Sequence, residues 1–435
     1  MKTSRRAFLS STLGAAAAFS MGCAGGRTDG PVIVAPRAAN GAVKPGAPDP
    51  RAPRAKEEPH YVVLIVLEGG YDPVLTFDPK EQSVVGANID CQYRDAERLK
   101  GRERFYGPLM APLMRHESDM CIIHGVRVDT VGHADGLQQI RMGHRIHSDG
   151  RISAWKPLAD RLPGGAPFGL MELPHRAQTE MPVPIDVALD PYTLKSLVAE
   201  GGPSYAAPPY FAQIQAAQLA QARSALAPYP KERKAYESAL VGAGRLHEWL
   251  GAADKQSDME DFKLGPSLQF AANAIRYNRA KFTIIHTPFV WFDTHADNLR
   301  LQQSRVTSAF HDIALFIDLL KSQRNAFGSL YDQTTVVIGT EMGRFPKLNS
   351  TAGKDHWPEN SWALLGKGIR RGVTLGRTDE KMRGSALDPR TGRPDVDGAR
   401  PIYVDTIGAT LTELSGGDVR AGGYADADVL WPVFT

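Results

Sequence analysis

Residues 61–72 read YVVLIVLEGGYD, and this stretch decides the fold class. Its first seven residues are apolar without a break and rich in β-branched side chains, which is typical of a strand buried on both faces. Similar runs occur further along the chain, at 120–126 (MCIIHGV), 281–289 (KFTIIHTPF), 334–339 (TTVVIG) and 361–366 (SWALLG). Strands of this kind belong to sheets that are covered by helices on both faces.

Helical segments lie between and after these runs. The clearest is 304–323, where apolar residues recur at helical spacing: Val306, Phe310, Ile313, Ile317 and Leu320. Helices are also predicted at 267–279 and 405–414, and within a helical insertion at about 190–262. Strands that alternate with helices predict an α/β fold with a mostly parallel central sheet. Right-handed crossovers then place the carboxyl ends of the strands at one edge.

The N-terminus predicts export. SRRAFL at residues 4–9 precedes an Ala-rich segment, as in a twin-arginine signal, so residues 1–25 are excluded from the fold and the twin-arginine translocase is an expected partner. The sequence SMGC, ending at Cys23, predicts either a lipid anchor or ordinary cleavage nearby. Residues 26–58 are rich in Gly and Pro, which predicts a flexible linker before a domain at 59–435. A periplasmic or lipid-anchored protein of the cell envelope is therefore expected.

Length and charge limit the remaining choices. A chain of 435 residues with 42% hydrophobic content can form one large domain or two ordinary ones. The net charge of +3 includes no large basic patch, which argues against nucleic-acid binding. After the N-terminus, no apolar stretch is long enough to span a bilayer, so membrane attachment is expected only through the signal or a lipid. Cys91 and Cys121 are either a disulfide pair or two free buried thiols.

Polar side chains follow the predicted strands at the point where each strand ends. They are carboxylates, imidazoles and one hydroxyl: Glu68, Asp72, Asp129, Thr130, His133, Asp135, Asp293, His295, Asp297, Glu341, Asp355 and His356. Ligands of open α/β sheets bind at this edge, and His with carboxylate suits a divalent metal ion. Each residue alone also has a structural reading, as a strand end, a helix cap, a polar turn or a hydrogen-bonding group. His144 and His147 are interpreted as a solvated helix face.

Several motifs carry a resemblance to a known family. They are SRRAFL, LEGGYD with FDPK after it, FDTHADN, GTEMGR, and N-x₃-GKDHWP followed by WALLGKGIRRG. Together they resemble the twin-arginine-exported domain-of-unknown-function family 1501 (DUF1501), over most of residues 60–420. That family is similar to the alkaline phosphatase-like superfamily, which includes sulfatases and metal-dependent phosphomutases. The resemblance therefore implies an alkaline phosphatase-like fold.

The resemblance also implies roles for the residues at the strand ends. Metal ligands would come from Glu68 or Asp72, Asp293, His295, Glu341 and His356, and the metal would be Zn, Mn, Ca or Mg. His133 stands near the place of the nucleophile, with Thr130 close by, but no Ser or Thr clearly begins the helix. Met342 stands where a His is usual. These departures leave the nucleophile mechanism of the superfamily unassured and leave open a single metal that activates water directly, with Arg344 or Lys354 stabilising an anion.

Two functions follow from these expectations. The first is an exported, metal-binding hydrolase of phosphate or sulfate esters, whose substrate is an anionic ester or a surface glycan. The alternative is a non-catalytic envelope protein that keeps the fold and binds a carbohydrate or a protein partner; a structural lipoprotein is a third interpretation. The stretch 339–358 (GTEMGRFPKLNSTAGKDHWP) is predicted to form one wall of the site. The competing interpretation is a long loop pinned by a salt bridge from Arg344 to Glu341 or Asp355.

Overall fold

The computed structural model describes residues 58–145, 154–166, 168–174, 185–188, 211–230, 233, 264–419, 424 and 428–435. Contacts divide the chain into two units, one formed by 56–207 and 245–435 and the other by 1–55 and 208–244. In the second unit, α6 (Phe211–Ala225) is one of the helices predicted for the insertion. The export signal, the linker up to residue 57 and most of the insertion lie outside the described residues.

A nine-stranded sheet forms the centre of the first unit, counted over the described residues. Its order is β14 (Val373–Leu375), β4 (Cys121–Arg127), β13 (Glu359–Gly366), β10 (Thr334–Gly339), β1 (Tyr61–Val66), β7 (Ala280–His286), β5 (Phe168–Leu173) and β6 (Val187–Ala188), with β15 (Ile402–Tyr403) paired to β4. All pairs are parallel except those of β13, which runs antiparallel to both of its neighbours. The predicted mostly parallel sheet is confirmed, and all five predicted strands belong to it.

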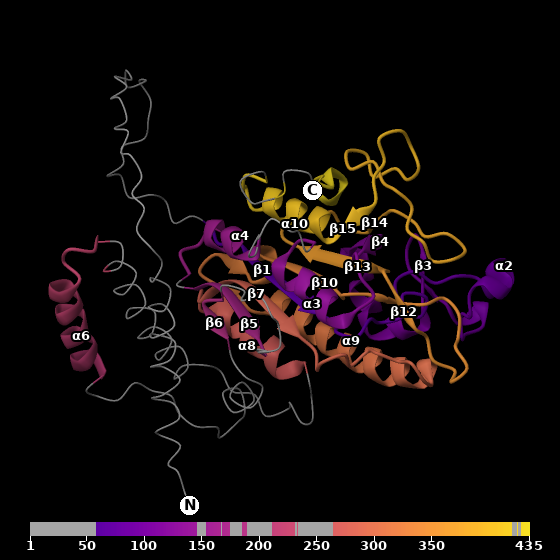
Figure 1. Cartoon of the computed structure of the whole chain (residues 1–435), viewed down its shortest axis with the longest axis horizontal. Helices are drawn as coiled ribbons and strands as arrows, with labels where there is room; N and C mark the ends of the chain where they lie inside the picture. Colours follow the sequence, from indigo (N-terminus) through magenta and orange to yellow (C-terminus); the bar gives the residue numbers. More distant parts are fainter. Residues whose placement is uncertain are drawn as a thin grey trace, which may run out of the picture. The chain divides into compact units, whose positions relative to one another are not determined.

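Helices cover both faces of this sheet (Figure 1). They are α3 (His133–Met142), α4 (Trp155–Arg161), α8 (Gly265–Arg276), α9 (Asn298–Ser322) and α10 (Val404–Leu414). Alternate residues of β1 face opposite sides, because successive side chains of a strand point in opposite directions. Val63 belongs to the core formed with α8 and α9, whereas Val62 belongs to the core formed with α3, α4 and α10. Burial on both sides explains the unbroken apolar run at residues 61–67.

Short elements fill the connections. They are α2 (Gln82–Val85), the 3₁₀ segments η1 (Gly86–Asn88), η2 (Asp95–Glu97), η3 (Pro108–Asp119), η4 (Tyr331–Gln333) and η5 (Trp431–Val433), and the strand pairs β2 (Leu99–Lys100) with β3 (Phe105–Tyr106), β8 (Arg324–Asn325) with β9 (Gly328–Ser329), and β11 (Gly343–Arg344) with β12 (His356–Trp357). The pair of β11 and β12 matters most for the site, because it lies in the connection from β10 to β13 and contains Arg344 and His356.

The direction of β13 explains how the chain returns to one edge of the sheet. β10 ends at this edge, together with the carboxyl ends of β1, β4 and β7. Because β13 is antiparallel to them, it begins where they end. The connection 340–358 therefore leaves the sheet and re-enters it at the same edge, and β11 and β12 pair within it. Residues before β13 can thus join residues that follow the other strands.

Two expectations about side chains are settled by burial. Cys91 and Cys121 are both free and buried, so of the two alternatives the structure has free thiols, and burial raises the pKa of Cys121 to about 12. His144 is not on a solvated helix face: it follows the end of α3 and is 2% exposed. His147 lies outside the described residues. None of the described helices has the length and apolar character needed to cross a membrane.

Candidate metal centre

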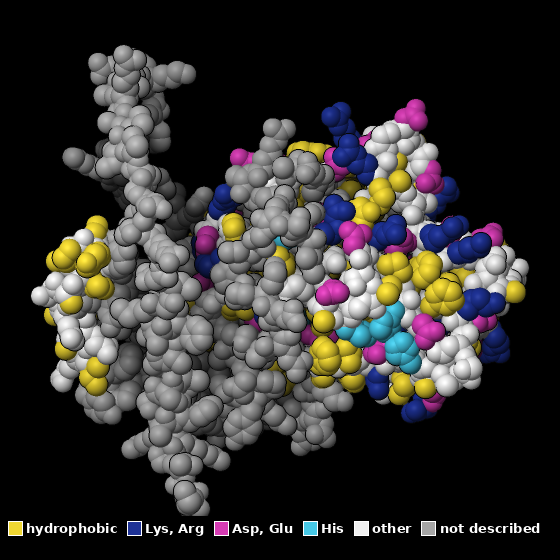
Figure 2. All heavy atoms as spheres, viewed as in Figure 1, with side chains coloured by type: hydrophobic (Ala, Val, Ile, Leu, Met, Phe, Trp, Pro, Cys, Tyr) yellow, Lys and Arg dark blue, Asp and Glu magenta, His cyan; other side chains and the backbone are white. Residues whose placement is uncertain are grey.

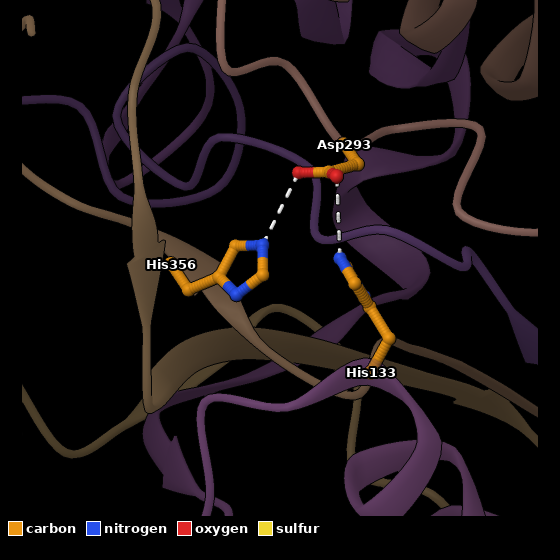
Figure 3. Close-up of side chains that lie close together, drawn as sticks. All are labelled: His133, Asp293 and His356. Carbon is orange, nitrogen blue, oxygen red and sulfur yellow. Dashed lines mark hydrogen bonds and ion pairs between the residues drawn. The ribbon is translucent and has the colours of Figure 1, made fainter.

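Three side chains converge at the shared edge of the sheet. His133, Asp293 and His356 each offer one ligand atom, and these atoms lie within 4.8 Å of one another (Figure 3). Nε2 of His133 is 3.4 Å from Oδ2 of Asp293, and Nε2 of His356 is 3.3 Å from Oδ1. Histidine side chains gather at the surface of this face of the molecule (Figure 2).

Each of the three comes from a different element. His133 is the first residue of α3, which follows β4; Asp293 lies between β7 and α9; His356 belongs to β12. A close passage of the backbone fixes Asp293: Gly69 has φ +105°, and a Cβ there would lie 2.4 Å from the Asp293 nitrogen. Only glycine tolerates this conformation and this contact, so the turn after β1 holds Asp293 in place.

His295 extends the group toward solvent. Its Nε2 is 3.0 Å from Oδ1 of Asp293 and 2.9 Å from Nε2 of His356. Its Nδ1 is 2.9 Å from Oδ1 of Asp355, which also accepts a hydrogen bond from Asn349. His295 is 49% exposed and Asp355 58%, so this is the open side of the site.

The connection 345–355 is shaped by hydrogen bonds to the His295 backbone. Asn349 and Thr351 both donate to the His295 carbonyl. At Gly353 a Cβ would lie 2.0 Å from the same carbonyl, so the close approach requires glycine. The connection therefore folds back at Asn349 and Gly353, and this brings His295 and His356 together.

Glu341 is buried behind His133. Its Oε1 is 2.8 Å from Nδ1 of His133, the nitrogen that faces away from Asp293. Oε1 also accepts a hydrogen bond from the Gly69 backbone at 2.7 Å, and Oε2 accepts one from Thr340. Glu341 therefore reaches the centre through the imidazole, and its role as a direct ligand stays a prediction.

Arg344 lies opposite His356 in the β11–β12 pair. It is 1% exposed, and its Nη1 is 2.7 Å from Oδ1 of Asp293. The guanidinium also donates to the carbonyls of Gly69 and Gly70. Among the described residues its ion-pair partner is Asp293, not Glu341 or Asp355. Arg344 thus forms a salt bridge, but with Asp293 and not with either predicted acid, and this salt bridge lies within the site.

These contacts set the charge states of the cluster. Burial alone would lower the pKa of His133, but Asp293 and Glu341 favour its charged form and raise the pKa to about 9. Burial would raise the pKa of Asp293, but hydrogen bonds from His133 and His356 and the charge of Arg344 hold it well below its usual range. Asp293 is thus a carboxylate at any physiological pH.

The other predicted residues lie apart from the three. Asp72 is fully buried, and its Oδ2 is 2.9 Å from Nζ of Lys354, which is also fully buried. The Thr130 hydroxyl accepts a hydrogen bond from Gly132 in its own loop. Glu68 faces Nδ1 of His286 at 2.8 Å. The structure therefore does not bring Asp72, Thr130 or Glu68 into the cluster of His133, Asp293 and His356.

Sequence reasoning missed a second buried polar group. Nε2 of His286 is 3.0 Å from Oε1 of Glu172, and that carboxylate also contacts Arg141, at 2.6 and 2.9 Å. Together with Glu68, these side chains are at most 4% exposed. A signal was present, because an acid inside the apolar run FGLMEL (168–173) must have partners if it is buried.

The donor set suits a divalent metal ion. Two imidazole nitrogens and one carboxylate oxygen are ligands that Zn²⁺ and related ions accept. In a tetrahedral zinc site with bonds of about 2.0–2.1 Å, ligand atoms lie roughly 3.3 Å apart. The contacts from His133 and His356 to Asp293 have about this length, although each reaches a different oxygen of the carboxylate. Nδ1 of His356 faces the Val131 carbonyl at 2.5 Å. That nitrogen must donate to the carbonyl, so a neutral His356 carries its lone pair on Nε2, the nitrogen that faces Asp293 and His295.

The chain matches a family and several solved structures. Residues 250–396 match the family described as "Protein of unknown function (DUF1501)", which confirms the resemblance over this segment. No curated protein matches. Similar structures include a protein in the alkaline phosphatase superfamily from Vibrio parahaemolyticus, with 9% identity, covering 84% of this chain and 68% of that chain, TM-score 0.40. Another is the lipoteichoic acid synthase LtaP from Listeria monocytogenes, with 10% identity, covering 86% of this chain and 75% of that chain, TM-score 0.37. A third is the PsFucS1 sulfatase from Pseudoalteromonas sp., with 12% identity, covering 87% of this chain and 76% of that chain, TM-score 0.36.

Proposed function

We propose that this chain is a metal-dependent hydrolase of phosphate or sulfate esters. The observation that carries the proposal is the convergence of His133, Asp293 and His356 at the strand edge, with ligand atoms within 4.8 Å of one another. The family match adds no activity, since the family is itself described as of unknown function. The proposal therefore depends on the chemistry of these side chains.

His133, Asp293 and His356 would hold the ion, with His295 beside them on the exposed side. A bound divalent cation lowers the pKa of a water molecule toward neutrality and polarises the oxygen of an ester. The protein's part is to fix the ligands: Arg344 holds Asp293, and the Val131 carbonyl orients His356. This geometry favours a positioning role for Arg344, because its guanidinium is buried against protein acceptors.

A substrate would enter on the side of His295 and Asp355, which are the exposed members of the group. Lys354 is buried against Asp72, so its charge is not presented to a substrate at this entrance. The negative charge of an ester would instead be balanced by the bound ion. Imidazoles on the open side can donate hydrogen bonds to ester oxygens. The glycan or other group that carries the ester is left to experiment.

Export belongs to the same proposal and has its own test. The basis is SRRAFL at residues 4–9, a segment outside the described residues. Replacing Arg5 and Arg6 by Lys should leave the precursor in the cytoplasm, which cell fractionation would show. Unchanged export of the double variant would remove the twin-arginine route. A lipid anchor at Cys23 would appear as palmitate labelling that is lost in Cys23→Ala.

The main experiment measures metal content and turnover together. The full chain, purified without chelator, should contain close to one equivalent of a divalent metal by elemental analysis, and should hydrolyse an aryl phosphate or an aryl sulfate. His356→Ala should lose most of the metal and the activity. His311→Ala is the matched control, because His311 is exposed on α9, outside the cluster. Equal metal in both variants would refute the assignment.

A second candidate is a non-catalytic binding protein. The observation that favours it is that His133, not Ser or Thr, begins α3, where the resemblance places a nucleophile. Stoichiometric metal without turnover of either ester would support this candidate. Turnover that is lost with the metal would exclude it.

A further inference from the structure

Glu341 has a contact pattern that differs from that of a metal ligand. It is fully buried, and its carboxylate faces three groups of the protein. Oε1 is 2.7 Å from the Gly69 nitrogen and 2.8 Å from Nδ1 of His133, and Oε2 is 3.0 Å from the Thr340 hydroxyl. An ionised carboxylate can only accept hydrogen bonds. The hydrogen between Glu341 and His133 therefore belongs to Nδ1.

This contact decides which nitrogen of His133 faces the cluster. With Nδ1 held by Glu341, Nε2 points at Asp293, 3.4 Å away (Figure 3). A neutral imidazole that keeps its proton on Nδ1 offers the lone pair of Nε2 to an ion. The same carboxylate is tied to the turn after β1 through Gly69, and that turn contacts Asp293. One buried acid thus links two of the three ligands.

Close packing leaves the pair little freedom to turn. α3 passes directly over Glu341, since a Cβ at Gly136 would lie 3.0 Å from the Glu341 Cβ. Such a contact is tighter than side chains normally adopt. The helix that begins with His133 is therefore seated on the residue that orients its imidazole. Rotation of the His133 ring would break the hydrogen bond from Nδ1 to Glu341, and the loss of a hydrogen bond to a buried carboxylate costs free energy.

We propose that Glu341 is a positioning residue that holds Nδ1 of His133, so that Nε2 is presented to an ion shared with Asp293 and His356. The part of this inference that concerns the ion rests on the proposed function. The part that concerns the hydrogen bond between Glu341 and His133 does not depend on it. Carboxylate–histidine–metal arrangements of this kind typically contribute 10- to 100-fold in metal affinity. The structure thus assigns Glu341 a role one step away from the metal.

Two substitutions separate positioning from direct ligation. In Glu341→Gln an amide oxygen remains to accept from Nδ1, so Co²⁺ affinity should stay within a fewfold of the parent. Glu341→Ala removes the acceptor and should lose about 10- to 100-fold. Thr340→Val is the matched control, because it removes another hydrogen bond of the same carboxylate and should bind like the parent. Affinity is measured by titration of the chelator-treated full chain, followed by the visible Co²⁺ spectrum.

The outcomes are distinct. If Glu341→Gln loses as much affinity as His133→Ala, Glu341 is a ligand and the inference is wrong. If Thr340→Val loses as much Co²⁺ affinity as Glu341→Ala, the affinity depends on the conformation of the loop and not on the contact between Glu341 and His133. That result would also overturn the inference. If the parent binds no Co²⁺, the proposed function fails instead.

A second measurement needs no metal. In histidine-labelled, metal-free protein, NMR should show a slowly exchanging Nδ1–H of His133, identified by its loss in His133→Ala. The signal should persist in Glu341→Gln and exchange rapidly in Glu341→Ala. A signal unaffected by Glu341→Ala would refute the positioning role whatever the metal result. This arm therefore tests Glu341 even where the proposed function fails.

Discussion

The buried group around His286 predicts that the stability of the protein falls in mildly alkaline solution. His286 is 1% exposed and lies between two carboxylates, with Nδ1 2.8 Å from Glu68 and Nε2 3.0 Å from Glu172. Burial alone would lower the pKa of His286. The two carboxylates outweigh burial and raise the pKa to about 9.

The sign and size follow from linkage. The pKa in the folded state is above the ordinary value of 6.5, so the folded protein keeps a proton that the unfolded chain releases. The stabilisation is complete below about pH 6.5 and is lost as the pH rises through 9. A shift from 6.5 to about 9 corresponds to about 3 kcal/mol in the free energy of unfolding.

The assay is urea unfolding of the chelator-treated protein at intervals between pH 6 and 9.5, for the parent and for His286→Gln. His133 also has a raised pKa and contributes its own loss in both proteins. The difference between the two curves therefore isolates His286. The variant should be less stable at pH 6, and the gap should narrow by about 3 kcal/mol by pH 9.5. A gap that stays constant with pH would refute the reasoning.

Three further predictions concern the site and the core. Because the pKa of His133 is raised to about 9, a proton competes with the ion, so Co²⁺ affinity should rise about tenfold per unit between pH 7 and 8.5; a flat profile would contradict this. Gly69→Ala, which puts a Cβ 2.4 Å from the Asp293 nitrogen at φ +105°, should lower the free energy of unfolding by at least about 2 kcal/mol in urea, and an unchanged value would be a failure. Cys91 and Cys121 are free and buried, so both should react with a thiol reagent only after unfolding and without reductant; a need for reductant would show a disulfide.

The strands were predictable because each carries its own signal. The run 334–339 coincides with β10, and 61–67 exceeds β1 by a single residue. Apolar, β-branched runs bounded by Gly or polar residues have little alternative to a buried strand. β5 lacked this clarity because Glu172 interrupts its apolar run, and its carboxylate is paired there with His286 and Arg141.

The partners within the site were not predictable to the same degree. Asp293, His356 and His133 are marked by their positions next to strands, and the structure brings them together. That Arg344 pairs with Asp293, 51 residues away, depends on the pairing of β11 with β12. The two strands have two residues each, too short for a periodic signal. The position of His356 at this edge depends on the antiparallel direction of β13. That direction is set by pairing with β10 and β4, which local sequence does not reveal.

The pairing of β1 also has a consequence for biosynthesis. Tyr61 is paired with Thr334 and Val62 with Phe282, so both neighbours of the first described strand are translated much later. At about 5–20 residues per second, roughly 220 residues of synthesis leave this strand without a partner for about 10–40 seconds. An unpaired apolar strand is prone to associate with other chains. The nascent chain should therefore be a client of ribosome-associated chaperones until residue 339 has emerged, and its ligand cluster cannot assemble before His356 is made.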